Sequence, residues 1–218
     1  MNAVAFVGGT GPQGLGLALR CAAAGERVLI GSRVAERAQA AVEKIRAALP
    51  RAEAEGYENL EAIERAERVV LTLPFAGLDG FLDAARARLA GKLVIDVTVP
   101  IAPRAGGFEL APIRGASSAG ELVQQGLPAS RVVTAFKNLP ADKLRDLSTP
   151  LEGDVVLCGN DAAACAEVAA LVVRLPRLRA VEAGGIANAR YVEAITVLLL
   201  NLNRRYRART SIAIVGLP

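Results

Sequence analysis

The sequence predicts an α/β fold built around a doubly wound parallel sheet, in a chain of 218 residues. Short β-branched runs alternate with helical patterns through the first two-thirds of the chain. These runs are almost continuously apolar, as expected of strands buried on both faces. A glycine-rich turn at residues 8–14 joins the first run to the first helical pattern. Together, the three observations favour parallel strands connected by helical crossovers.

The first hundred residues supply five predicted strands and four predicted helices. The first helix ends at Gly25 and the second is stopped by Pro50, residues that commonly follow a helix C-terminus. The third strand is weak because its apolar residues are few. The strands cover residues 3–8, 27–31, 51–57, 68–75 and 92–100, and the helices cover residues 12–25, 34–49, 59–66 and 78–90.

The remaining residues predict a loop, one more crossover and a second unit. Residues 100–117, rich in glycine and proline, predict a loop. A helix at 118–126 and a sixth strand that runs into a turn at 131–140 complete a Rossmann-type domain over residues 1–148. A small C-terminal α/β domain over residues 149–218 ends in a long helix. Its predicted strands are 154–159 and 178–183, and its predicted helices are 161–175 and 186–206.

Composition limits the kinds of ligand and partner. The net charge of +4 comes almost wholly from arginine, which suits anionic ligands that carry phosphate or carboxylate. Aromatic residues make up only 4% of the chain and do not alternate with basic clusters, so we expect no nucleic-acid partner. The apolar run at 194–202 is too short to span a bilayer, so we expect no membrane partner. The strand-like N-terminus lacks the pattern of a signal peptide, which predicts a cytoplasmic protein.

Histidine and cysteine usage restricts the chemistry further. The chain has no histidine, which excludes histidine-based acid–base catalysis and most zinc sites. Its three cysteines, Cys21, Cys158 and Cys165, lack metal-ligand spacing and are expected to be buried, reduced thiols. The sequence therefore predicts no metal site.

The glycine-rich turn predicts a dinucleotide-binding site. The pattern Gly9-x-Gly11-x-x-Gly14 follows a strand and opens a helix, which is the context this motif requires. Gly9 permits the tight turn, Gly11 lets a pyrophosphate approach the backbone, and Gly14 lets the helix pack on the strand. A ligand-free glycine turn is the alternative. The candidate pyrophosphate-binding residues are Gly9, Thr10, Gly11, Pro12, Gln13 and Gly14.

The end of the second strand favours NADP(H) over NAD(H). An NAD site usually carries an acidic residue here, to bind the ribose 2′-hydroxyl. This chain has Ser32 and Arg33 instead, with Arg37 one helical turn later. These side chains, with Thr10 from the glycine turn, are suited to surround a 2′-phosphate. The alternative is that both arginines are ordinary solvated helix residues.

Three further segments follow the carboxyl ends of predicted strands, where ligands bind in this topology. Each segment is a candidate wall of the cofactor site, and the alternative is that it is a structural loop. For Asp96 the alternative is that its carboxylate caps its own turn. The candidate ligand contacts are Leu73, Pro74, Thr98, Pro100 and Ala135.

Several motifs in order resemble those of the F420-dependent NADP reductases. They are GGTGPQG at 8–14, GSR at 31–33, LTLP at 71–74, DVTVP at 96–100, SSAGELV at 117–123 and NARYVEAITVLLLNLN at 188–203. The resemblance implies a Rossmann domain with a small C-terminal domain, a homodimer, and hydride transfer between NADP(H) and C5 of a deazaflavin, coenzyme F420. By position it assigns the 2′-phosphate to Thr10, Ser32, Arg33 and Arg37, and the pyrophosphate to the glycine turn.

The chain departs from this resemblance after the sixth strand. Archaeal members carry a histidine in the segment that here reads TAFKNLPA, and this chain has Lys137 and then Asn138. These two residues are the candidate catalytic residues, with Lys137 offering positive charge to the reduced ring. Hydride transfer between stacked rings depends mainly on positioning, so the change need not abolish it.

Other functions remain open from the residues alone. The acceptor is a deazaflavin, or else a flavin, a pterin-like carrier, or a carbonyl or imine compound. A hydroxyacid dehydrogenase is disfavoured, because Lys137 and Asn138 are adjacent and precede Leu-Pro, and so cannot share a helix face. A non-catalytic NADP-sensing protein is the remaining alternative.

Overall fold

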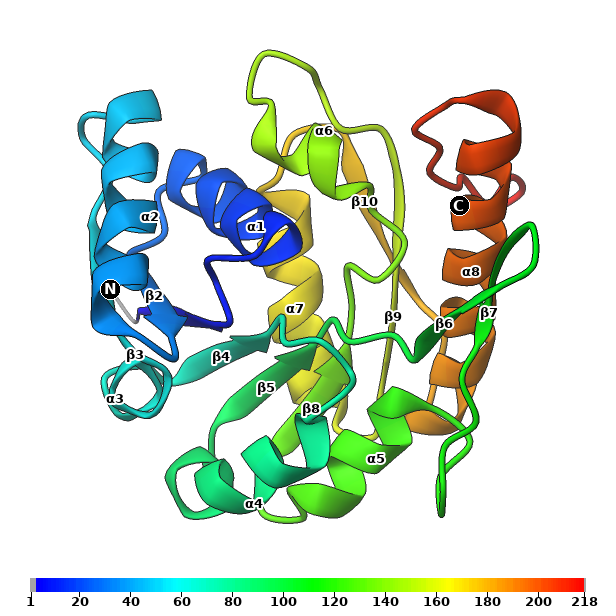
Figure 1. The fold of residues 1–218 in the computed structure, drawn as a ribbon, viewed down its shortest axis with the longest axis horizontal. Coiled ribbons are helices and arrows are strands. Elements are labelled where there is room, and N and C mark those ends of the chain that lie inside the picture. The colour runs from blue at the N-terminus through cyan, green and yellow to red at the C-terminus, as the bar shows by residue number, and fades with distance from the viewer. Residues whose placement is uncertain (1–2, 218) are drawn as a thin grey trace.

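The computed structural model describes residues 3–217 and contains one eight-stranded sheet and a two-stranded hairpin (Figure 1). The strand order of the large sheet is β10-β9-β8-β5-β4-β1-β2-β3. Neighbouring strands are parallel except β8 and β9, which are antiparallel. The strands are β1 (Val4–Val7), β2 (Val28–Ser32), β3 (Ala54–Glu58), β4 (Arg68–Leu71), β5 (Leu93–Asp96), β8 (Arg131–Thr134), β9 (Gly153–Gly159) and β10 (Leu178–Glu182).

Helices cover both faces of this sheet, and each face has its own apolar core. The helices α1, α2 and α7 pack on one face with Val4 and Phe6 of β1, whereas α3, α4 and α5 pack on the other with Ala5 and Val7. The alternation along β1 is the period of two expected of a strand. The helices are α1 (Pro12–Ala23), α2 (Ala35–Ala48), α3 (Asn59–Glu64), α4 (Leu78–Leu89), α5 (Ala119–Gly126), α6 (Ala141–Arg145), α7 (Ala162–Val173) and α8 (Ala189–Tyr206).

Strand β1 marks the point where the strand order reverses. It pairs with β2 on one side and with β4 on the other, both in parallel. The chain runs outward from β1 to β2 and β3 and then returns through α3 to β4 on the other side of β1, and a crevice opens beyond the carboxyl ends of these strands. Ligands bind at this position in doubly wound folds.

The structure confirms the predicted Rossmann-type class and the terminal long helix. The helix at 186–206 is present as a short 3₁₀ turn (Ile186–Asn188) followed by α8. Strands β9 and β10 extend the same sheet rather than forming a separate one, with Val133 opposite Gly159 across the junction. The division into domains at residue 148 stays a prediction.

One predicted loop is wrong. Within residues 100–117, β6 (Ile101–Arg104) and β7 (Gly107–Leu110) form an antiparallel hairpin that lies against α8 (Figure 1). Gly106, with a φ of 81°, supplies the left-handed turn residue, and Pro103 is tolerated because the hairpin strands are edges. The glycine and proline content that predicted a loop is therefore what a short hairpin also needs.

Over residues 3–217, none of the helices combines the length and apolar character that crossing a bilayer demands.

Candidate functional site

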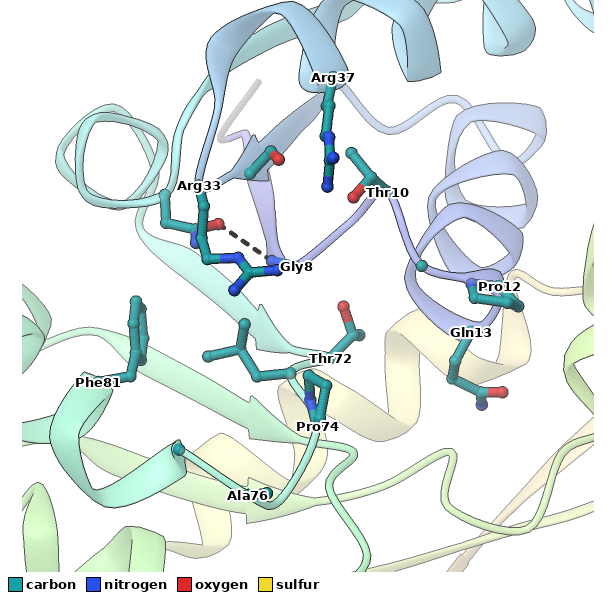
Figure 2. A pocket seen from close by; sticks show the side chains of 15 residues that line it. Gly8, Thr10, Pro12, Gln13, Arg33, Arg37, Thr72, Pro74, Ala76 and Phe81 are labelled. Atoms are coloured by element: carbon teal, nitrogen blue, oxygen red, sulfur yellow. Dashed lines mark hydrogen bonds between the residues drawn. The ribbon is translucent and has the colours of Figure 1, made fainter.

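A cavity of about 570 Å³ lies at the crevice beside β1, β2 and β4 (Figure 2). Its size suits a cofactor-sized ligand. Nine of the predicted site residues line it, namely Thr10, Gly11, Pro12, Gln13, Ser32, Arg33, Arg37, Leu73 and Pro74. Six residues that were not predicted also line it, namely Gly8, Asn59, Thr72, Ala76, Gly77 and Phe81.

The glycine turn forms the floor of this cavity, and its three motif glycines have different neighbours. A Cβ on Gly9 would lie 2.7 Å from the Phe6 carbonyl oxygen, and one on Gly14 would lie 2.4 Å from Thr72 Oγ1. Both positions therefore exclude side chains through the protein's own packing. A Cβ on Gly11 would meet only the Gly8 oxygen, at an ordinary 3.5 Å. The space over Gly11 is thus open to a ligand, as the motif predicts for the approach of a pyrophosphate.

The N-terminus of α1 faces the same space with free backbone donors. Gly11 is the N-cap, Pro12 occupies the first turn, and no side chain caps the helix. The first amide bonded into the helix is that of Leu15, which donates to the Gly11 oxygen. The amides of the first turn therefore have no helical acceptor and, with the helix dipole, favour an anion.

The two predicted arginines point into the cavity from above the glycine turn. Figure 2 shows the Arg33 side chain directed toward Gly8 and the Arg37 side chain beside Thr10. Ser32 is buried at the end of β2, and its Oγ accepts a hydrogen bond from the Val34 amide at 3.4 Å. Within residues 3–217, neither guanidinium forms a hydrogen bond or an ion pair. Two unpaired cations beside two hydroxyls form a suitable site for a phosphate.

The opposite wall is mostly apolar. Pro74 and Phe81 lie across the cavity from the arginines (Figure 2), and Leu73 also lines the cavity. A second, smaller cavity of about 220 Å³ adjoins the first, sharing Arg33 and Phe81 with it. An apolar wall opposite a guanidinium is suited to enclose a flat heterocycle.

Asn59 holds the glycine turn in place. It follows β3 at the start of α3, and its Oδ1 accepts a hydrogen bond from the Gly8 amide at 3.1 Å (Figure 2). Sequence reasoning missed Asn59, although its place at the carboxyl end of a strand was a usable signal. Gly8 and Thr72 were missed because the motif was read as starting at Gly9, and because the strand ending at Leu71 was predicted to continue to Phe75.

The other predicted site residues lie outside the lining of these two cavities. Gly9 and Gly14 act through the packing of the turn described above. Thr98, Pro100 and Ala135 are buried near the carboxyl ends of β5 and β8. Asp96 caps its turn, because its Oδ1 accepts from the Thr98 amide at 2.9 Å and from Thr98 Oγ1 at 2.6 Å.

Lys137 and Asn138 are both buried at the turn after β8. Lys137 Nζ lies 2.6 Å from Asp96 Oδ2 and 3.1 Å from Glu193 Oε1, and it also donates to the Thr98 carbonyl oxygen. Asn138 Nδ2 donates to the Asp154 carbonyl oxygen at 2.7 Å. Neither residue lines the large cavity, and their assignment as catalytic residues stays a prediction.

The donor set at the crevice fits a dinucleotide phosphate. Backbone amides, an open approach over Gly11 and two unpaired guanidiniums supply what a pyrophosphate and a 2′-phosphate require. Over residues 3–217, the cysteine and carboxylate side chains form no group of three or more suited to a metal ion.

Comparison with known proteins gives the family. The family described as NADP oxidoreductase, coenzyme F420-dependent, matches residues 3–100. F420-dependent NADP reductases from Methanothermobacter marburgensis and Methanothermobacter thermautotrophicus are 39% and 41% identical to the chain, over 99% of its length. The matched regions cover 99% and 95% of those proteins. The chain belongs to the F420-dependent NADP reductase family. It is therefore an oxidoreductase whose family uses NADP(H) and coenzyme F420.

Solved structures agree with this family at the level of the fold. A crystal structure from Arthrobacter sp. FB24, assigned as an F420-dependent NADP reductase, superposes with a TM-score of 0.82 at 27% identity. The superposition covers 99% of this chain and 100% of the Arthrobacter chain. An imine reductase from Bacillus cereus shares the fold alone, with a TM-score of 0.64 at 15% identity over 91% of this chain and 60% of the other.

Proposed function

We propose that this chain catalyses hydride transfer between NADPH and coenzyme F420. Family membership supports the reaction, and the geometry of the crevice supports the cofactor. The single observation that carries the cofactor assignment is the pair of unpaired guanidiniums, Arg33 and Arg37, in a cavity that also contains Thr10 and Ser32.

In this proposal each part of the crevice binds one part of NADPH. The amides of the α1 first turn and the open space over Gly11 bind the pyrophosphate. Arg33, Arg37, Thr10 and Ser32 bind the 2′-phosphate. Phe81 and Arg33 enclose the adenine in the smaller cavity, and the nicotinamide extends past Leu73 and Pro74 toward Thr98, Pro100 and Ala135.

The chain's contribution to catalysis is alignment. When bound, NADPH would supply a hydride from C4 of its dihydronicotinamide to C5 of the deazaflavin, and the reduced deazaflavin would take up one proton from water at a ring nitrogen. Because no proton has to move at the transferred carbon, the protein has to hold two flat rings at contact distance and exclude water. The buried ends of β5 and β8 are suited to that task.

The test is anaerobic mixing of the protein with NADPH and a panel of acceptors: F420, FMN and a pterin. We expect rapid NADPH oxidation with F420 and a rate at least tenfold lower with the others. Oxidation by FMN or the pterin at a higher rate would assign a different acceptor. Tight NADPH binding with no oxidation by any acceptor would favour a sensor instead.

We also propose that the chain forms a homodimer through α8 and functions in the cytoplasm. The outer face of α8 exposes Tyr191, Leu198 and Tyr206, at 57%, 56% and 67%, on a helix whose inner face is buried. Apolar side chains at helical spacing on an exposed face are typical of a subunit contact. The three free, buried cysteines fit a reducing compartment.

A further inference from the structure

Three charged side chains meet in the interior between the NADPH crevice and α8. The Lys137 ammonium contacts Asp96 of β5 and Glu193 of α8, and all three side chains are at most 1% exposed. Each residue comes from a different part of the chain, 41 and 56 positions from Lys137. We refer to Asp96, Lys137 and Glu193 as the buried triad.

Lys137 has no donor left for a substrate. An ammonium group carries three N–H bonds. Its three acceptors are Asp96 Oδ2, Glu193 Oε1 and the Thr98 carbonyl oxygen. Burial alone would lower the pKa of Lys137, but the charges of Asp96 and then Glu193 outweigh it and raise the pKa. The side chain is thus a charged, fully bonded group rather than a free acid.

Glu193 extends the triad to a helix N-terminus. Its Oε2 accepts from the Ala119 amide at 3.1 Å and its Oε1 from the Gly120 amide at 3.2 Å, the first amides of α5. Burial raises the pKa of Glu193, and the Lys137 ammonium and the Ala119 amide oppose that rise. The Lys137 ammonium neutralises only one of the two carboxylate charges. The positive N-terminal end of the α5 dipole compensates part of the other charge.

The backbone around Lys137 links the triad to the cofactor crevice. Phe136 has a φ of 59°, a left-handed conformation uncommon for a large side chain. Its carbonyl oxygen accepts a hydrogen bond at 3.2 Å from Gln13 Nε2, and Gln13 lines the large cavity. On the other side, Thr196 Oγ1 of α8 lies 3.2 Å from the Lys137 carbonyl oxygen and 3.0 Å from the Val192 carbonyl oxygen, so the two acceptors share its single proton. The Lys137 segment is therefore tied both to α1 and to α8.

We propose that the buried triad is a positioning device for hydride transfer, which fixes the nicotinamide end of the crevice relative to α8. Through Asp96 and Thr98 it holds the loop after β5, and through Glu193 it holds α8 and the start of α5. This inference rests on the proposed NADPH:F420 reaction, in which a small displacement of either ring slows transfer. Lys137 then acts without touching the reacting atoms.

The experiment compares Lys137→Met, Glu193→Gln and the double variant. For each we would measure kcat with F420, the Kd for NADPH, the pH dependence of kcat and the thermal midpoint. Lys137→Met leaves two buried carboxylates without a cation, so we expect kcat to fall about 100-fold while the NADPH Kd changes less than threefold. Glu193→Gln keeps the shape and should lower kcat about tenfold.

The double variant separates positioning from direct catalysis. Glu193→Gln removes one of the two carboxylate charges that Lys137→Met leaves without a cation. We therefore expect kcat of Lys137→Met/Glu193→Gln to be at least threefold higher than that of Lys137→Met, with an unchanged pH profile. If kcat of the double variant does not recover and its fall on one side of the pH optimum disappears, Lys137 is instead a catalytic residue. Lys92→Met at the opposite edge of the sheet, where Nζ bonds the Ala66 oxygen, is the matched control and should retain kcat.

The outcomes also separate this inference from the proposed function. Wild-type protein that binds NADPH but reduces no F420 would overturn the reaction and the inference together. Wild-type protein that turns over, with Lys137→Met retaining wild-type kcat, would overturn the inference alone. A rise in NADPH Kd that accounts for the whole loss of rate would place Lys137 in the cofactor site.

Discussion

At the scale of single residues, the arginines that we propose to bind the 2′-phosphate differ in their surroundings from an arginine that stabilises the fold. Arg33 and Arg37 are exposed and unpaired within residues 3–217. Arg20 is the opposite case, since it is buried and donates to the carbonyl oxygens of Leu144 and Lys143 at 3.0 and 2.7 Å. Arginine content alone could not distinguish the two, because a guanidinium serves either purpose.

The buried thiol of Cys21 gives a prediction about stability and pH. Burial, and then the Glu26 charge, raise the pKa of Cys21 from 9.0 to about 12. The unfolded chain therefore loses this proton first as the pH rises above 9, so the free energy of unfolding falls by about 1.4 kcal/mol per pH unit until the folded pKa is reached. Urea unfolding between pH 8 and about 10.5 would measure this slope.

Cys21→Ala provides the comparison for that measurement. The variant lacks the titrating group, so its stability should decline less steeply above pH 9 than that of the wild type. Equal slopes in both proteins would contradict the assignment. The native thiol should also resist disulfide reagents at pH 8 and react after unfolding.

At the scale of elements, local motifs were predictable and long-range contacts were not. The glycine turn, the Ser-Arg pair after β2 and the long terminal helix are contiguous patterns, and the structure contains each of them. The contact of Lys137 with Glu193 joins positions 56 residues apart, and no spacing in the sequence signals it. The β6–β7 hairpin was missed because glycine and proline mark tight hairpins as well as loops.

The packing of the glycine turn against β4 gives a prediction at this scale. In Gly14→Ala the new Cβ would lie 2.4 Å from Thr72 Oγ1 and 2.8 Å from the Gly9 Cα, so the turn and α1 have to separate. We expect the NADPH Kd to rise at least 100-fold and the free energy of unfolding to fall by about 1–3 kcal/mol. Calorimetric titration and urea unfolding would measure the two effects.

Gly80→Ala is the matched control for that variant. Gly80 lies inside α4, and a Cβ there meets no atom within 4 Å. This substitution should leave NADPH binding unchanged and stabilise the protein by about 0.5–1 kcal/mol, since alanine is the better helix former. Equal losses of NADPH affinity in the two variants would contradict a specific role for the Gly14 contact.

At the scale of the whole molecule, one continuous sheet places the cofactor crevice and α8 on a shared framework. β9 pairs with β8, and the Lys137 turn follows β8 directly. The rule for doubly wound sheets predicted ligands at the carboxyl ends of the strands, and the observed strand order places the crevice beside β1. The arrangement of α8 depends on side-chain contacts, which composition and periodicity do not specify.

The proposed homodimer is testable through the exposed face of α8. Leu198→Glu introduces a charge into an apolar contact, so we expect the mass in solution to fall from twice 22.6 kDa to that of one chain. Light scattering after size exclusion would measure it. Val173→Glu, at an exposed valine of α7, is the control and should keep the dimer. A wild-type mass of 22.6 kDa would contradict the proposal.

The most direct test of the cofactor assignment compares NADPH with NADH in the wild type and in Arg33→Ala/Arg37→Ala. Each charge-assisted contact to the 2′-phosphate contributes about 1.5–3 kcal/mol. We predict that the double variant raises the KM for NADPH at least 100-fold and changes the KM for NADH less than threefold. An equal rise for both cofactors, or an unchanged KM for NADPH, would contradict it.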